Sequence, residues 1–196
     1  MAIYAVLGAT GWWLATVFVR TPWGLGRPAL GPRWLTFGSA IALGAALGVA
    51  LVGTTRWLVR RTRWANALTR ELREGLLGMR TDAALPLAIA SALGEELFFR
   101  GFVQTLLVGH LGAVAGVLAA STLFGAAHIP WNRRLAGWTV MAWAIGVVFG
   151  TLVVATGELV VAIVAHGVIN YFNLRFMLAL DPPPVVLPTR RVSTST

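Results

Sequence analysis

Two adjacent glutamates, Glu95 and Glu96, lie inside a segment that is otherwise apolar enough to span a membrane. A carboxylate near the centre of a bilayer costs about 2.5–3.5 kcal/mol on insertion scales. Ionisable residues at that depth usually face the interior of a helix bundle and mark a functional site. The pair therefore constrains both the fold of the chain and the place of its chemistry.

The composition is typical of a protein embedded in a membrane. Apolar residues make up 57% of the 196-residue chain and charged residues only 12%, whereas soluble domains carry about 25% charged residues. Because each span needs about 20 apolar residues, the length suits one bundle of helices and leaves little for a soluble domain. Cysteine is absent, which excludes disulfides, thiolate nucleophiles and thiolate metal ligands.

Hydropathy predicts an all-α, polytopic transmembrane bundle. The six expected spans cover residues 2–19, 35–59, 83–108, 111–129, 135–156 and 159–180. Together they form a single membrane-embedded domain over residues 1–180. Residues 181–196 begin with an aspartate and three prolines, cannot continue a helix, and are expected to form a disordered tail.

The segment between the second and third spans, residues 60–80, predicts an amphipathic helix. It places apolar side chains at four-residue spacing, with arginines between them: Trp64, Leu68, Leu72 and Leu76. The pattern favours a helix in the membrane interface, with its arginines on anionic lipid headgroups. The alternative is that this helix forms a surface on which the substrate docks.

The distribution of arginine predicts the orientation of the bundle. Eleven arginines fall on one side of the six-span arrangement: Arg56, Arg60, Arg61, Arg63, Arg70, Arg73, Arg80, Arg133, Arg134, Arg190 and Arg191. The opposite side carries Arg20, Arg27 and Arg33 in its first loop. The positive-inside rule then places both termini in the cytoplasm. We expect these arginines to interact with the lipid bilayer, and we expect no nucleic-acid partner.

The polar residues of the third span have distinct positions on its helix. Glu96 and Arg100 are four residues apart, so their side chains share a face and can form an ion pair, which lowers the cost of burying both. Glu95 is turned about 100° from Glu96 and has no local partner. An unpaired carboxylate in a low-dielectric pocket is a candidate general acid or base.

Two further spans carry candidate hydrogen-bond donors. His166 and Asn170 are one turn apart on the sixth span, and a neutral imidazole and a carboxamide can both donate to charge that develops on a substrate carbonyl. His128 lies at the end of the fourth span, just before Pro130. The combination of these residues with the two glutamates and the arginine predicts a hydrolytic site between the three spans.

Three motifs resemble those of the CPBP family of intramembrane glutamic endopeptidases, which includes the CAAX prenyl proteases and the bacterial abortive-infection (Abi) group. Residues 95–100, Glu-Glu-Leu-Phe-Phe-Arg, resemble EExxxR. Residues 124–128, Phe-Gly-Ala-Ala-His, resemble FxxxH, and residues 166–170, His-Gly-Val-Ile-Asn, resemble HxxxN. The three occur in the order that the family has.

The resemblance implies a role for each of these residues. Glu95 with His128 would activate the attacking water, and His166 with Asn170 would hold the oxyanion. The Glu96–Arg100 pair would orient the site. Phe124 would shape the pocket beside His128. Independently of the motifs, we expect Phe124 and Phe99 to contact the substrate. No metal or other cofactor is implied, because the family is of the glutamate type.

The short chain favours a bacterial member of the family over the prenyl-protein branch, whose eukaryotic relatives have more spans. We therefore expect a protein of the bacterial cytoplasmic membrane that cleaves a membrane-anchored protein or peptide. Two alternatives stay open. Glu95, His128 and His166 could form the site of a zinc-dependent protease, or the same residues could serve a non-catalytic immunity or transport protein.

Overall fold

The computed structural model describes residues 1–19, 35–130 and 132–180, and within these ranges the chain is helical with no strand. In chain order the main elements are α1 (Ala2–Leu14), η1 (Ala15–Val19), α2 (Phe37–Arg61), α3 (Arg63–Glu74), η2 (Thr81–Ala83), α4 (Ala84–Glu96), η3 (Leu97–Gln104), α5 (Thr105–Leu111), α6 (Ala113–Ala127), η4 (Arg133–Leu135), α7 (Ala136–Thr156) and α8 (Leu159–Leu178). The expected tail at 181–196 and the arginines at 20, 27 and 33 lie outside the described residues.

Four helical stretches are long and apolar enough to cross a membrane: Ala2–Val19, Phe37–Arg61, Arg133–Thr156 and Leu159–Leu178. They establish the chain as a helical membrane protein, as its composition predicts. The other two expected spans are also helical but differ in kind. One is the continuous helix α4–η3–α5, which carries the charged residues of the candidate site, and the other is α6, which has only 15 residues.

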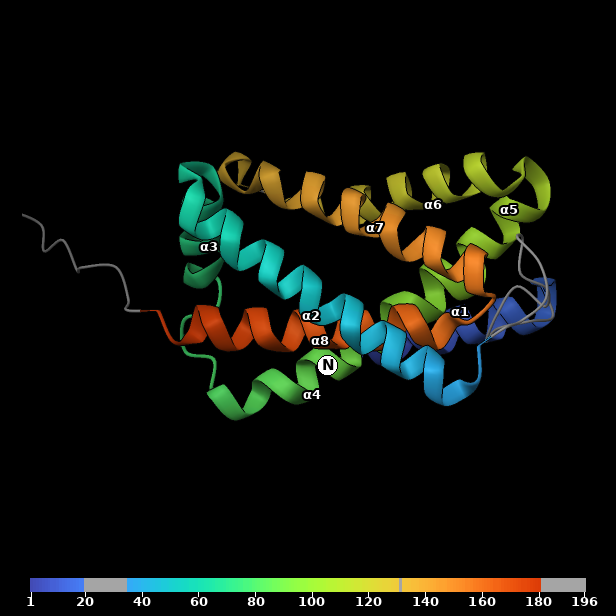
Figure 1. Ribbon diagram of the computed structural model, residues 1–196, viewed down its shortest axis with the longest axis horizontal. Helices are drawn as coiled ribbons and strands as arrows, with labels where there is room; N and C mark the ends of the chain where they lie inside the picture. The colour runs from blue at the N-terminus through green and yellow to red at the C-terminus, as the bar shows by residue number, and fades with distance from the viewer. Residues whose placement is uncertain (20–34, 131, 181–196) are drawn as a thin grey trace, which may run out of the picture.

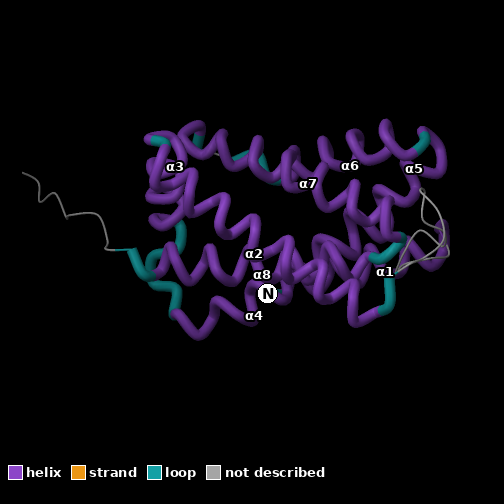
Figure 2. Tube along the Cα trace, in the orientation of Figure 1, coloured by secondary structure: helices purple, strands orange, loops and turns teal. Residues whose placement is uncertain are grey.

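The helix α8 lies in the middle of the bundle, packed against α2 on one side and α4 on the other, while α6 packs on α7 (Figures 1 and 2). Gly44 lets α2 approach α8 closely, because a Cβ at this position would lie 2.5 Å from the carbonyl oxygen of Val161. The core beside α8 consists of Phe149, Val153, Leu159, Ala162, Ala165 and Ile169. This packing holds α8 in place, and the polar side chains of α4 make their contacts with it.

The amphipathic segment forms α3 at one end of the bundle, beside the C-terminal ends of α2 and α8 (Figure 1). Thr62 separates α2 from α3 by its extended backbone, and its side chain accepts a hydrogen bond from the backbone N–H of Ala65. The turn allows α3 to lie across the end of the bundle.

The helix that carries the glutamates changes its winding directly after them. Residues Leu97–Gln104 form a π-helical stretch between the α-helical segments α4 and α5. The hydroxyl of Thr105 donates to the carbonyl oxygen of Arg100 at 2.8 Å, which satisfies a backbone group inside the widened stretch. Stretches of π-helix are rare and often occur at functional sites, and here the stretch contains Arg100 and follows Glu96.

Candidate active site

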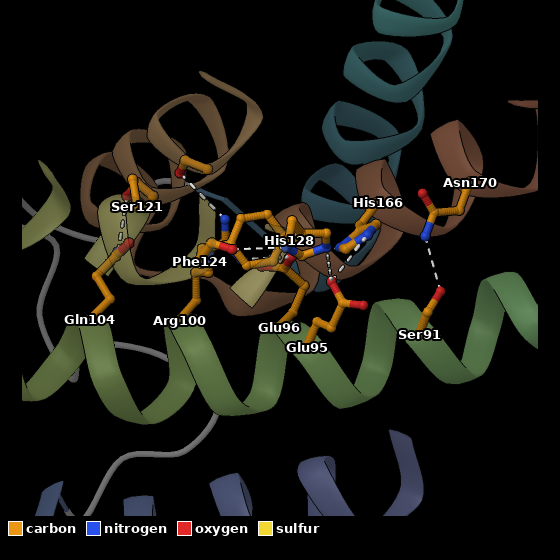
Figure 3. A network of polar contacts seen from close by, with 12 residues as sticks. Ser91, Glu95, Glu96, Arg100, Gln104, Ser121, Phe124, His128, His166 and Asn170 are labelled. Carbon is orange, nitrogen blue, oxygen red and sulfur yellow. Dashed lines mark hydrogen bonds and ion pairs between the residues drawn. The ribbon is translucent and has the colours of Figure 1, made fainter. Parts of the chain in front are cut away.

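The site is built on two antiparallel helices, α4 and α8, whose polar residues meet at matching turns. His166 contacts Glu96, and Asn170, one turn later on α8, contacts Ser91, just over one turn earlier on α4. Figure 3 shows these residues facing one another across the gap between the two helices. The two contacts are four residues apart on α8 and five residues apart on α4. They therefore lie one above the other along the interface between the two helices.

Glu96 forms the fully buried centre of this row. Its Oε1 accepts from Arg100 Nη1 at 3.1 Å and from His166 Nδ1 at 2.7 Å. Glu96 is 0% exposed and Arg100 is 2% exposed. Arg100 also donates to the carbonyl oxygen of Gly146 on α7 at 3.4 Å, and its guanidinium lies 4.2 Å from the centre of the Phe124 ring. The expected Glu96–Arg100 pair is present, and it links α4, η3, α7 and α8.

Glu95 points to the other side, towards two imidazole rings. Its Oε2 lies 3.6 Å from Nε2 of His128 and 3.8 Å from Nε2 of His166. Both distances are longer than a hydrogen bond, and within the described residues this buried oxygen has no hydrogen-bond partner. The structure therefore brings together the carboxylate and both histidines that the sequence singled out, and leaves the carboxylate oxygen unpaired between them.

In each imidazole ring, the hydrogen bond at Nδ1 determines whether Nε2 can donate or accept a hydrogen bond. His128 Nδ1 lies 2.8 Å from the carbonyl oxygen of Phe124, and His166 Nδ1 bonds to Glu96. Because both partners are acceptors, both Nδ1 atoms carry a proton, and a neutral ring then has a lone pair on Nε2. His166 can therefore donate from Nε2 only as an imidazolium, which differs from the expectation that a neutral His166 would serve as a donor.

His128 reaches the site because α6 is short. The helix ends at Ala127, and His128 is its C-terminal cap, with φ −103° and ψ 18°. The hydroxyl of Thr139 on α7 donates to the carbonyl oxygen of His128 at 2.9 Å, which holds the end of α6 against α7. Because α6 ends three residues before Pro130, the imidazole of His128 lies beside Glu95.

Asn170 lies beside the two histidines. Its Nδ2 donates one hydrogen to Ser91 Oγ at 2.9 Å, and Ser91 Oγ in turn donates to the carbonyl oxygen of Ala88 at 3.2 Å. The amide therefore keeps one N–H for a substrate. Sequence reasoning missed Ser91, although its position one turn before Glu95 in an apolar span is a signal that could have found it.

The two phenylalanines occupy different positions. Phe124 is 3% exposed and its ring centre lies 4.5 Å from that of His128, so it lines the site. Phe99 packs edge-on against Phe124 with 5.0 Å between ring centres, and it is not among the described residues that line the cavity. Phe99 therefore supports the ring of Phe124 from outside the cavity lining.

The site opens into a cavity of about 420 Å³. Glu95, His128, His166 and Asn170 all line it. Tyr4 of α1 lies in the same wall, and no sequence signal pointed to it. The apolar stripe of α3 also faces this cavity through Trp64, Leu68 and Leu72, together with Leu76 in the turn that follows α3.

Among the described residues, no group of three or more His, Cys, Asp or Glu side chains is arranged to hold a metal ion. The arrangement offers a carboxylate and two imidazole nitrogens that can accept and return one proton, beside an amide donor.

Comparison with known proteins relates this site to one family. Residues 81–172 match the model of the type II CAAX prenyl endopeptidase Rce1-like family. No curated protein and no solved structure gives a significant match. The matching segment contains both glutamates, both cavity histidines and the asparagine, so over these residues the chain is similar to the Rce1-like family of type II CAAX prenyl endopeptidases.

Proposed function

We propose that this chain is an intramembrane endopeptidase of the glutamate type. It hydrolyses a peptide bond in a membrane-anchored protein or peptide, with water activated by Glu95 and His128. The observation that carries the proposal is the unpaired Oε2 of Glu95, buried in the cavity wall at 3.6 Å from His128 Nε2 and 3.8 Å from His166 Nε2. The family, which is one of peptidases, supports the reaction class.

In the proposed reaction a water molecule binds beside Glu95 Oε2 and His128 Nε2. Glu95 with His128 removes one proton as the oxygen attacks the carbonyl carbon of the substrate, and the carbonyl oxygen becomes an oxyanion. The free N–H of Asn170 and the Nε2–H of a charged His166 donate to that oxyanion. The tetrahedral intermediate then collapses, the C–N bond breaks, and the proton passes to the leaving amine.

Glu96 and Arg100 do not touch the substrate in the proposed reaction but hold His166 in position. The carboxylate of Glu96 accepts the Nδ1 proton of His166, which sets the orientation of the ring and stabilises its imidazolium. Arg100 pairs with Glu96 and holds its carboxylate in place. These two residues are positioning residues, because neither of them lines the cavity.

The cavity and the charge distribution fit a substrate held in the membrane. Most of the cavity wall is apolar, and the arginine-rich α3 lies at the end of the bundle that the positive-inside rule assigns to the cytoplasm. We propose that the protein resides in the bacterial cytoplasmic membrane with both termini in the cytoplasm. Its substrate then enters from the bilayer.

The test compares new protein termini in two strains, one that expresses the wild-type chain and one that expresses Glu95→Gln. Cleavage by this site creates termini in membrane proteins that occur only with the wild-type chain. Glu74→Gln, which removes an exposed carboxylate of α3, is the matched control and should produce the same termini as the wild type. Identical termini in the wild-type and Glu95→Gln strains would reject the proposed function.

A further inference from the structure

Tyr4 of α1 brings a phenol into the wall of the active-site cavity, and the proposed reaction does not use it. The residue lies outside residues 81–172, over which the chain is similar to the Rce1-like family. Its side chain is half-buried. Because a tyrosine hydroxyl that is withdrawn from bulk water usually finds a hydrogen-bond partner, the groups near this phenol indicate what it does.

Close packing of α1 on α4 determines where the phenol lies. Tyr4, Gly8 and Gly11 share one face of α1, because they are four and three residues apart. A Cβ at Gly8 would lie 3.1 Å from Gly94 Cα, and a Cβ at Gly94 would lie 3.1 Å from Tyr4 Cα. The backbone of Tyr4 therefore packs against the residue that directly precedes Glu95.

The side chain of Tyr4 reaches the face of α4 that borders the cavity. Leu87, Ser91 and Glu95 follow one another at four-residue spacing on this face, and all three line the cavity. Tyr4 lines the same cavity, and its phenol interacts electrostatically with the carboxylate of Glu95. The phenol and the carboxylate are therefore neighbours in one wall.

The carboxylate of Glu95 lacks the support that the other reacting groups have. His128, His166 and Asn170 each form a hydrogen bond with a neighbouring group of the protein. Within the described residues no hydrogen bond reaches Glu95, whose Oε2 lies 3.6 Å and 3.8 Å from the two imidazoles. A base that takes a proton from water must be held in a productive orientation, so this carboxylate needs a donor.

The hydroxyl of Tyr4 is a donor that is free to serve Glu95. Four side chains with a hydroxyl line the described part of the cavity, and three of them donate to backbone carbonyl oxygens of their own helices: Thr55, Thr69 and Ser91. The Tyr4 hydroxyl donates to none of the described residues. Within this part of the wall, a hydroxyl without an acceptor thus lies beside a carboxylate without a donor.

We propose that Tyr4 is a positioning residue for Glu95, and that its phenol O–H donates to the carboxylate and holds the base in place during proton transfer. Catalytic hydrogen bonds are often long before a substrate binds and shorten in the complex. This inference rests on the proposed function and gives α1 a part in the reaction. A hydrogen bond to a charged group is strong enough that its loss should lower kcat about 10- to 100-fold.

The contact itself is tested by ¹⁹F NMR, which needs no substrate. The chain has two tyrosines, Tyr4 and Tyr171, so labelling with 3-fluorotyrosine gives two resonances, which Tyr4→Phe and Tyr171→Phe assign. Glu95→Gln should shift the Tyr4 resonance more than that of Tyr171. Glu74→Gln, which changes an exposed carboxylate of α3, should shift neither. A Tyr4 resonance that is the same in wild-type and Glu95→Gln protein would overturn the inference.

The role of Tyr4 in the reaction is tested by steady-state kinetics on a fluorogenic peptide that contains a cleavage sequence found in the comparison of strains. Tyr4→Phe keeps the ring and should lower kcat with KM nearly unchanged, because Tyr4 acts through Glu95 and not through the substrate. The matched control is Tyr171→Phe, which removes the same hydroxyl from a half-buried ring of α8 that is not among the described residues lining the cavity. This control should keep the wild-type kcat.

The two measurements separate the inference from the function on which it rests. Wild-type kcat in Tyr4→Phe, or an equal loss in Tyr171→Phe, would overturn the role of Tyr4 while leaving the protease intact. A Tyr4 resonance that depends on Glu95, without any cleavage by the wild-type chain, would reject the proposed function and support the contact. Thermal stability in detergent is measured for both tyrosine variants, so that a loss of folded protein is not taken for a loss of kcat.

Discussion

His166 Nδ1 lies 2.7 Å from Glu96 Oε1, and this contact determines which nitrogen of the ring faces the cavity. The carboxylate accepts the Nδ1 proton, so Nε2 is the atom that points towards Glu95. A buried glutamate that is paired with Arg100 thus controls the chemistry of a residue on another helix. In the proposed mechanism the two neighbouring glutamates therefore have separate tasks: Glu95 takes part in the reaction, and Glu96 orients His166.

Glu95→Gln should abolish turnover without loss of the fold. The substitution keeps the size of the side chain and removes the proton acceptor, so the rate should fall by at least ~10²-fold. The amide N–H can donate to Nε2 of a neutral His128, and the amide oxygen can accept from Nε2–H of a charged His166, so thermal stability in detergent should stay close to that of the wild type. Cleavage rate and thermal stability are measured together, with Glu74→Gln as the control. Near-normal turnover of Glu95→Gln would show that this carboxylate is not the base.

Glu96→Gln should reduce stability and activity together. It leaves Arg100, which is 2% exposed, without a counter-ion, and breaking a buried ion pair by removing one partner costs about 3–5 kcal/mol. It also weakens the acceptor that orients His166. Arg100→Ala should show a similar combined defect. A Glu96→Gln protein with unchanged thermal stability would contradict the role of this pair.

Local helix geometry made the Glu96–Arg100 pair predictable. Two residues four apart on one helix meet whatever the rest of the bundle does, and the structure has this contact at 3.1 Å. Hydropathy likewise predicted the helices, because a span must be apolar over its full length. The boundary of α6 was less predictable, since its early end at Ala127 depends on contacts with α7.

The contacts between helices could not be predicted from residue spacing within a single helix. Nothing within α8 indicates that His166 would bond to Glu96 and not to Glu95, because that choice depends on how α8 packs against α4. Gln104 was missed for the same reason. It is fully buried and donates to the carbonyl oxygen of Gly150 on α7 at 3.1 Å, one turn after the contact of Arg100 with Gly146.

Gly150→Ala should destabilise the protein, because a methyl group there would displace the buried side chain of Gln104, which donates to the carbonyl oxygen of Gly150. A Cβ there would overlap the side-chain oxygen of Gln104 and lie 3.1 Å from Val117 Cγ1. Overpacking of this kind costs about 1–3 kcal/mol. The matched control is Gly53→Ala in α2, where a Cβ would meet nothing within 4 Å. The result is measured as thermal stability in detergent, and equal effects of the two substitutions would argue against the close packing of η3 and α7.

Asn170→Ala and Ser91→Ala should separate donation to the oxyanion from support of the donor. Removing an oxyanion donor lowers kcat by about 10²–10³-fold, and this is the expected effect of Asn170→Ala. Ser91→Ala removes the acceptor that orients the amide and should lower kcat less, with KM nearly unchanged. Steady-state kinetics on one peptide substrate gives both values. A larger loss for Ser91→Ala than for Asn170→Ala would reverse the assigned roles.

Activity should survive the removal of divalent metal ions. Two imidazoles and one carboxylate are also the ligand set of catalytic zinc sites, so the choice between the two mechanisms needs a direct measurement. If Glu95 and His128 activate water themselves, EDTA or phenanthroline leaves the cleavage rate largely intact, and added zinc does not raise it. Purified protein is analysed for metal content beside these assays, with Glu95→Gln as the inactive reference. Stoichiometric zinc, together with loss of activity on chelation and its recovery on adding zinc back, would replace the glutamate mechanism by a metal-dependent one.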